Sequence, residues 1–240
     1  MKKIIYLLLI GFLFFSCNAN LTKTAKRMQV METGVSSPTT IEELEDAIKK
    51  YELRIIDIIS SESQVGIWYK ILGTHYMDEG MYGKALEAFQ KAVAIYPANQ
   101  NLFYYVGLCA GFMSKASLDF DATGDDAKSI QYLNLAEKSY LRAIELENTY
   151  VRALYGLSIL YVFEFNESFK AIPYLQKLLT IDTKHTDAMF VLARAYYENG
   201  NFDGAVDLYD KIERLSTSEE KKAEARANKK VVLDAQFTTN

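Results

Sequence analysis

Residues 66–99 carry the pattern that most constrains the fold of this chain. It consists of two stripes of apolar and small residues, which in chain order are Tyr69, Leu72, Gly73, Tyr76, Ala85, Phe89 and Ala92. Steps of three and four residues place each stripe on one face of a helix. Gly80 separates the stripes and Pro97 follows the second, as expected where helices end. The segment therefore predicts a helical hairpin, which needs further copies to bury its apolar face.

Three further copies of the pattern follow along the chain. Their stripes are Phe103, Val106, Gly107, Ala110, Ala136, Tyr140 and Ala143; Leu154, Leu157, Ser158, Tyr161, Ala171, Leu175 and Leu178; and Met189, Leu192, Ala193, Tyr196, Ala205, Tyr209 and Ile212. This recurrence resembles the tetratricopeptide repeat (TPR), a helix–turn–helix unit of about 34 residues. A generic amphipathic bundle would show the helical spacing without small residues at fixed positions.

The resemblance implies an all-α fold, a TPR solenoid of about four repeats with N- and C-terminal capping helices. We expect the superhelix to cover residues 40–237, with repeats near 66–99, 100–150, 151–185 and 186–219. TPR arrays are scaffolds for binding, so the resemblance also implies that the protein is not an enzyme.

Helix-start signals flank the repeats. They are two capping boxes, Thr40 with Glu43 and Ser216 with Glu219. The first box and the apolar steps after it predict an amphipathic helix from Ile41 to about Ser60, packed on the first repeat as a cap. The second predicts a last helix over residues 219–237, rich in Lys, Glu and Ala. A polar outer helix keeps the end of a solenoid soluble.

Repeat two contains an insertion, residues 113–129, which is acidic. We expect it to lengthen both helices of the repeat and to leave a solvated loop at residues 122–126. The run from Asp119 to Gly124 resembles the start of an EF-hand calcium loop. Such a loop needs a bidentate Glu at its twelfth position, which here is Ile130, so no metal site is expected.

The first residues of the chain have the features of a targeting segment. Lys2 and Lys3 precede an apolar stretch, residues 4–15, which is too short to span a bilayer. The stretch ends just before Cys17, and residues 1–16 thus resemble a bacterial lipoprotein signal peptide. An ordinary cleaved signal and an uncleaved anchor are the alternatives.

A lipoprotein signal implies that Cys17 becomes the lipidated N-terminus, with a diacylglyceryl group and an amide-linked acyl chain such as palmitate. Two or more acyl chains give stable membrane anchoring. Residues 17–39 would then be the lipidated Cys and a polar, flexible tether. Asn18, where an Asp often retains lipoproteins on the inner membrane, permits delivery to the outer membrane. The expected location is the bacterial envelope, on the periplasmic side of the outer membrane.

Composition excludes several other functions. The chain has 27 basic and 31 acidic residues and a formal net charge of −4, which gives no basis for nucleic-acid binding. No Gly-rich phosphate loop, Ser/His/Asp set or pair of catalytic acids is present, and no cofactor is expected. His75 and His185 lack Cys or carboxylate neighbours at ligand spacing. Cys109 falls inside a predicted buried helix, so we expect it to be a core thiol.

In TPR superhelices the first helix of each repeat lines a concave groove, so the resemblance implies a partner-binding site there. The groove positions carry Lys70, Tyr104, Leu108, Phe112, Arg152, Tyr155, Ile159, Phe163, Phe190, Arg194 and Tyr197. The apolar members form a central stripe, which favours an amphipathic helix or an extended apolar peptide. Alternatively, several of them pack against the insertion or between repeats.

Two basic groove positions match the carboxylate clamp of chaperone-docking TPR domains. These are Lys70 and Arg152, but Thr74 and Tyr105 stand where that clamp has asparagines. Recognition of a chain-terminal carboxylate is therefore not expected.

The sequence favours a membrane-tethered adaptor that binds a protein or peptide partner in the periplasm through its concave groove. Two alternatives stay open. One is a TPR component associated with a TRAP-type transporter and a small apolar ligand. The other is an outer-membrane assembly lipoprotein, because one subunit of the β-barrel assembly machine is also a TPR lipoprotein.

Lipidation can be tested at Cys17. We expect Cys17→Ala to move the protein from the membrane fraction to the soluble fraction, because the acyl chains hold it on the bilayer. Cell fractionation measures this, together with incorporation of labelled palmitate. Unchanged membrane association, with no label in the unaltered protein, would contradict the assignment.

Overall fold

The computed structural model describes residues 40–118 and 127–239. The predicted signal peptide, Cys17 and its tether, the EF-hand-like run from Asp119 to Gly124 and the predicted loop at residues 122–126 lie outside the described residues. The chain divides into two units, Met1–Ser60 and Ser61–Asn240, and each is described by itself.

The described residues are helical, with short turns and no strand among them, which confirms the predicted all-α class. In chain order the helices are α3 (Ile41–Asp78), α4 (Tyr82–Ile95), α5 (Gln100–Leu118), α6 (Ala127–Leu146), α7 (Val151–Ile159), the π-helix η1 (Leu160–Glu164), α8 (Ser168–Ile181), α9 (Thr186–Glu198), α10 (Phe202–Leu215) and α11 (Glu219–Thr239).

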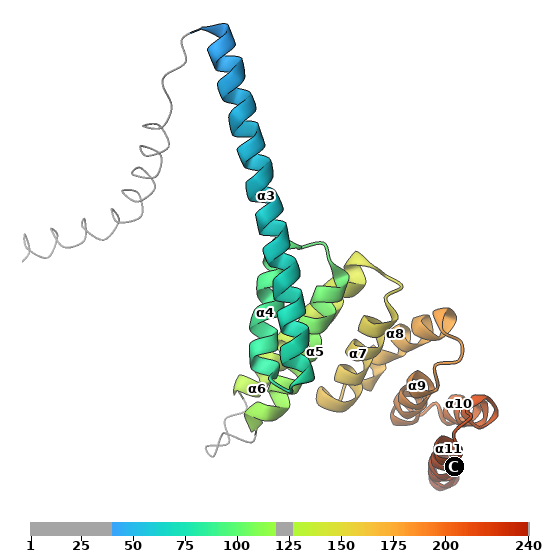
Figure 1. Ribbon diagram of the computed structural model, residues 1–240. Coiled ribbons are helices and arrows are strands. Elements are labelled where there is room, and N and C mark those ends of the chain that lie inside the picture. Colours follow the sequence, from blue (N-terminus) through green and yellow to red (C-terminus); the bar gives the residue numbers. More distant parts are fainter. Residues whose placement is uncertain (1–39, 119–126, 240) are drawn as a thin grey trace, which may run out of the picture. The chain divides into compact units, whose positions relative to one another are not determined.

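Within the second unit, each helix from α4 to α11 packs mainly on its neighbours in sequence, as Figure 1 shows. The first helices of successive repeats also contact one another, α5 with α7 and α7 with α9. The repeats therefore stack side by side, with their first helices forming one continuous surface. A chain in which each repeat contacts the repeats next to it is characteristic of a solenoid.

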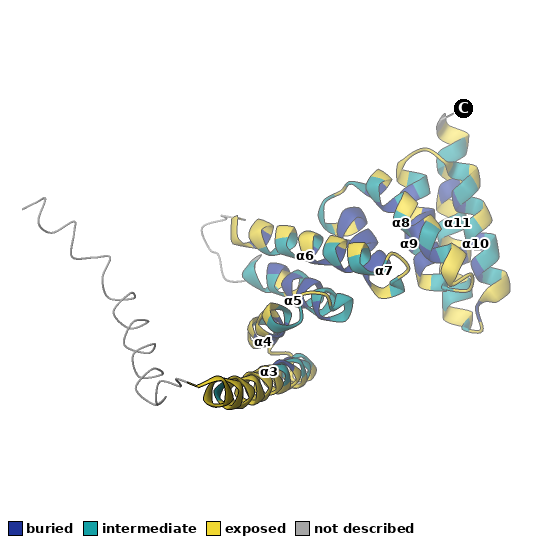
Figure 2. Cartoon of the chain, turned by 90° about the horizontal axis from the view of Figure 1, so that it is seen from above, coloured by how far each residue is buried: buried dark blue, intermediate teal, exposed yellow. Residues whose placement is uncertain are grey.

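Most residues of the stripes are buried and form the core, in dark blue in Figure 2. Phe89 is fully buried against Gly73, where an added Cβ would lie 2.8 Å from the ring. Tyr140 of α6 contacts Gly107 of its own repeat and Gly156 of the next. One tyrosine ring thus joins repeats two and three. The buried stripe residues lie on the helix faces that the spacing predicts.

Leu72 departs from this pattern, because its side chain is 41% exposed. The matching positions of the later repeats, Val106, Leu157 and Leu192, are buried. A position that is buried inside an array is therefore exposed at its end.

Gly80, the predicted stop in repeat one, ends α3, and a second glycine, Gly200, ends α9. Gly80 has φ +73°, its N–H donates to the carbonyl of Met77 at 3.0 Å, and Met81 N–H donates to that of Tyr76 at 2.7 Å. Gly200, at φ +75°, ends α9 with the same arrangement. Both are left-handed caps that satisfy carbonyls of the last helical turn, and glycine adopts them without strain.

The N-terminal capping box is confirmed. Thr40 Oγ1 accepts from Glu43 N–H, and Glu43 Oε2 accepts from Thr40 N–H, each at 3.2 Å. The predicted helix end near Ser60 is wrong, since α3 continues to Asp78. Residues 60–64 contain no Pro or Gly to end a helix. The apolar side chains that were expected to pack on the first repeat are exposed. Among residues 41–60, Ala47 alone is half-buried, and all the others are exposed.

The last helix begins where expected, but a different serine caps it. Ser218 Oγ accepts from Lys221 N–H at 3.3 Å, whereas Ser216 Oγ accepts from Ser218 N–H in the preceding turn. The predicted pairing of Ser216 with Glu219 is therefore wrong. Two side chains of α11, Ala225 and Val232, are buried, and most of its other residues are exposed or half-buried.

The ends of the insertion in repeat two are helical. Helix α5 runs to Leu118 and α6 starts at Ala127, and the two helices pack closely. A hydrogen bond of 2.9 Å between the hydroxyls of Ser114 and Ser129 joins them near this end. Both serines are buried. The hydrogen bond satisfies two polar groups that would otherwise be costly to bury.

The same glycine-to-alanine change should have different effects on stability at two positions. Gly73→Ala places a methyl group against the buried ring of Phe89, so we expect a loss of about 1–3 kcal/mol. Gly111→Ala adds a methyl group with no heavy atom within 4 Å, inside helix α5. Because glycine is a poor helix former, this change should be neutral or stabilise by up to about 1 kcal/mol. Urea denaturation measures both, and equal effects would contradict the packing described.

Candidate partner-binding surface

None of the predicted groove side chains is fully buried. Four are exposed, namely Phe112, Arg152, Phe163 and Arg194, and the other seven are half-buried. They come from α3, α5, α7, η1 and α9. The structure gathers seven of the eleven into two pockets and places the other four elsewhere.

The first pocket lies between α5 and α7, and we call it the α5–α7 pocket. It has a volume of about 230 Å³. Its lining consists of Leu108, Gly111, Phe112, Lys115, Tyr140, Gly156, Ile159, Leu160 and Glu164. Phe112 is stacked on Tyr82, with ring centroids 4.2 Å apart. Because two glycines and several aliphatic side chains line it, the pocket is mainly apolar.

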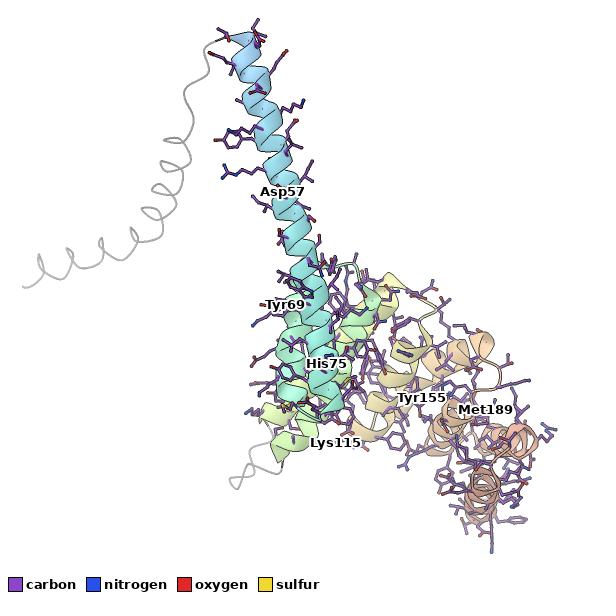
Figure 3. All side chains as sticks on the ribbon, in the orientation of Figure 1. Asp57, Tyr69, His75, Lys115, Tyr155 and Met189 are labelled. Atoms are coloured by element: carbon purple, nitrogen blue, oxygen red, sulfur yellow. The ribbon has the colours of Figure 1, made fainter. Side chains whose placement is uncertain are left out.

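One ion pair lies at this pocket. Lys115 Nζ of α5 is 3.2 Å from Glu164 Oε1 of η1, and the two side chains are 68% and 23% exposed (Figure 3 labels Lys115). Because the lysine is largely solvated, the pair adds little to folding stability. It does present one positive and one negative group beside an apolar surface. These groups can hydrogen-bond the backbone or polar side chains of a partner.

A π-helix forms one wall of the α5–α7 pocket. In η1 the N–H of Phe165 donates to the carbonyl of Leu160 at 3.0 Å, a step of five residues. Asn166 follows with φ +53°. The wider turn leaves Tyr161 and Val162 buried, while Phe163 is 43% exposed and Glu164 faces Lys115. Single π-turns inside helices are frequent at functional sites.

The second pocket lies near the C-terminal end of the array, and we call it the C-terminal pocket. It has a volume of about 390 Å³. Its lining consists of Phe163, Phe190, Val191, Arg194, Tyr197, Glu198, Tyr209, Glu224, Asn228, Val231 and Val232. Arg194 Nε donates to Glu198 Oε1 at 2.8 Å, and its guanidinium lies 5.0 Å from the ring centre of Phe163. This pocket combines aromatic side chains with a paired cation.

The remaining four predicted residues line neither pocket. The ring of Tyr104 lies 5.9 Å from that of Tyr150 and 6.1 Å from that of Tyr140, so it packs between repeats two and three. Burial raises the pKa of the Tyr104 hydroxyl, and the charge of exposed Arg152 partly opposes that shift. Lys70 is half-buried on α3. The ring contacts of Tyr104 with Tyr140 and Tyr150 indicate a structural role for Tyr104.

Tyr155, labelled in Figure 3, is half-buried between repeats three and four. Its ring lies 5.1 Å from that of His185, and burial raises the pKa of its hydroxyl. His185 in turn caps α9, because its Nδ1 accepts from Ala188 N–H at 3.1 Å. Over residues 40–118 and 127–239, no group of three His, Cys, Asp or Glu side chains is arranged to hold a metal ion.

Cys109 is fully buried on α5, and burial raises the pKa of its thiol to about 12. A thiol with so high a pKa is neutral at physiological pH and a poor nucleophile. The structure therefore places this cysteine in the core, as its sequence position indicates.

Several lining residues were not among the predicted site residues. Lys115 and Glu164 come together only because α5 is lengthened and η1 is a π-helix. Glu224, Asn228 and Val231 reach the C-terminal pocket from α11, which sequence analysis treats only as a cap. The small residue at Gly156 was the one available signal, since it leaves room beside the ring of Tyr140.

Comparisons with known families support the repeat assignment. Residues 67–99 and 170–219 match family models of the tetratricopeptide repeat. A TPR repeat-containing protein of Borreliella burgdorferi is 26% identical over 224 residues, which cover 92% of this chain and 95% of that protein. These matches confirm that the chain contains TPR repeats, at residues 67–99 and 170–219.

Solved structures of similar fold are TPR proteins. MamA matches with a TM-score of 0.52 and 22% identity over 80% of this chain and 97% of its own. A thermophilic TPR protein of Thermus thermophilus, TTC0263, matches with 0.55 and 18% over 79% and 96%. YrrB, a TPR protein with an unusual peptide-binding site, matches with 0.54 and 19% over 83% and 97%. At such identities the likeness concerns the fold, which is an all-α TPR solenoid.

Tyr155 and Leu157, two residues apart on α7, should differ in how much each contributes to stability. Leu157 is fully buried, so Leu157→Ala should lower the free energy of unfolding by about 2–5 kcal/mol. Tyr155→Ala should cost less, because that side chain already contacts solvent. Urea denaturation ranks the two variants. A larger loss for Tyr155→Ala would place its ring in the core and not at the surface.

Proposed function

We propose that this protein is a membrane-tethered adaptor that binds a protein partner through the α5–α7 pocket and the C-terminal pocket. One observation carries the proposal: two mainly apolar hollows lie on the first helices of the repeats, each beside an ion pair. Interfaces that bind proteins combine an apolar centre with a polar rim. The ligand class that fits best is a peptide segment with apolar side chains at intervals.

Pocket size favours a peptide over a small-molecule ligand. The α5–α7 pocket, at about 230 Å³, is smaller than the roughly 300–1,000 Å³ usual for small-molecule sites. Such a volume suits one or two apolar side chains of a partner. The C-terminal pocket is larger, but Arg194 and Glu198 are already paired there. We therefore prefer protein binding to the carriage of a small apolar ligand in transport.

The repeats themselves also favour an adaptor. TPR proteins are in general non-catalytic scaffolds, and YrrB, which shares the fold, is described as having a peptide-binding site. We propose binding without catalysis for this chain. The described residues contain no sheet to which a peptide could add a strand. A peptide partner would therefore be bound through its side chains or as a helix, and two pockets along a helical surface suit both modes.

Membrane tethering rests on the lipoprotein-like leader and Cys17. None of the described helices is long and apolar enough to cross a membrane. We propose that acyl chains on Cys17 hold the array in the bacterial envelope, on the periplasmic side of the outer membrane. A flexible coil as long as the proposed tether, residues 18–39, spans on the order of 25 Å. The repeats would then bind partners close to the membrane surface.

Photocrosslinking in cells tests the proposed surface. A photoreactive phenylalanine analogue replaces Phe112 of the α5–α7 pocket or Phe163 of the C-terminal pocket, one at a time. Both side chains are partly exposed, at 40% and 43%, so the analogue can reach a bound partner. We expect each to form a covalent adduct of defined mass with a protein that mass spectrometry identifies.

Phe169 supplies the matched control. It is 58% exposed, lies on α8 and lines neither pocket. The same analogue at this position should give no specific adduct. Adducts of equal yield from all three positions, or from Phe169 alone, would contradict binding through the pockets.

A further inference from the structure

The first half of α3 exposes a continuous apolar stripe. The stripe consists of Ile41, Leu44, Ile48, Tyr51, Ile55 and Ile58. Their exposures range from 36% for Tyr51 to 77% for Ile41. Exposed apolar surface of this extent marks a contact surface. A single helix that packs on nothing is marginally stable in water, so the stripe calls for a partner.

The spacing of the stripe defines the kind of partner. Its residues step by three and four in strict alternation, which is the heptad repeat of a coiled coil. Isoleucine occupies every a position, at Ile41, Ile48 and Ile55, and the d positions are Leu44, Tyr51 and Ile58. Isoleucine at a with leucine at d favours two parallel strands, and the first heptad has this pair in Ile41 and Leu44. We propose that residues 41–58 of two copies of this chain form a parallel, in-register, two-stranded coiled coil.

The flanking charges favour the parallel orientation. The e positions carry Glu45 and Glu52, and the g positions carry Ala47 and Arg54. In a parallel pair, position g of one helix meets position e of the other, so Ala47 lies beside Glu52 of the second copy and no like charges meet. An antiparallel pair brings e positions together, which places Glu45 against Glu52 of the second copy. Like charges at these positions repel.

The seam has defined ends. Thr40 and Glu43 cap the helix just at the first a residue. The next a position after Ile55 is Glu62, and a charged residue there ends the apolar seam. The coiled coil therefore occupies residues 41–58. It does not depend on the proposed partner binding, which uses other helices.

Neighbouring isoleucines provide a matched test. Ile55 lies in the seam at 55% exposure, and Ile56 lies outside it at 60%. In the full-length chain in detergent, sedimentation equilibrium should show a dimer for the unaltered protein and for Ile56→Lys. Ile55→Lys should raise the dimer dissociation constant at least tenfold, while circular dichroism shows that the repeats stay helical. A monomeric unaltered protein, a trimer, or equal effects of the two variants would overturn the proposal.

Cysteine crosslinking tests the orientation. In a parallel, in-register pair, residue 55 of one copy faces residue 55 of the other, so Ile55→Cys should form an interchain disulfide on mild oxidation. Ile56→Cys should not, because it lies outside the seam. In an antiparallel pair, residue 55 of one copy faces Leu44 of the other. The Ile55→Cys variant would then remain a dimer but form no interchain disulfide. That failure alongside a dimeric mass would overturn the parallel arrangement.

Discussion

Close contact between an aromatic ring and a glycine on a facing helix is the interaction on which this array depends. Phe89 against Gly73, and Tyr140 against Gly107 and Gly156, bring helix backbones near enough for the remaining stripe residues to interlock. Any side chain at these glycines would meet a ring that is itself buried. The contact at Gly156 also joins two repeats, so the same chemistry sets both the hairpin and the stacking of hairpins.

That stacking places the first helices of the repeats beside one another, and the candidate surface follows from it. The floor of the α5–α7 pocket includes Tyr140, and Gly156 leaves the space beside its ring. The π-turn of η1 then shapes the wall and directs Glu164 toward Lys115. Core packing and the binding surface therefore share residues, and a change at Tyr140 would affect both.

The N-terminal part of α3 has a different organisation from the repeats. Its large apolar side chains are exposed, and six of them follow the stripe from Ile41 to Ile58. A heptad seam and a TPR stripe use the same steps of three and four, so the spacing alone also predicts a cap that packs on the first repeat. The two differ in what covers them: another part of the same array in one case, a second helix of the same kind in the other.

Much of the fold could be read from the sequence, because each repeat is encoded by local spacing. The stripes, the glycine stop at Gly80 and the capping box at Thr40 all depend on residues close together in the chain. Errors occurred where local signals were ambiguous. Two serines near the start of α11 could each cap that helix, and Ser218 does so. Residues 60–64 contain no Pro or Gly to stop a helix, so α3 continues past Ser60 to Asp78.

The sequence by itself determined the all-helical class, the stripes of each hairpin and most of the side chains that form the core, since helical periodicity and residue size fix these within one hairpin. Tertiary structure alone decided the two pockets. Lys115 meets Glu164, and Arg194 lies over Phe163, because helices from different repeats and a π-turn converge there. No local spacing encodes a meeting between separate repeats, so a binding surface built from several of them becomes visible only when the array is assembled.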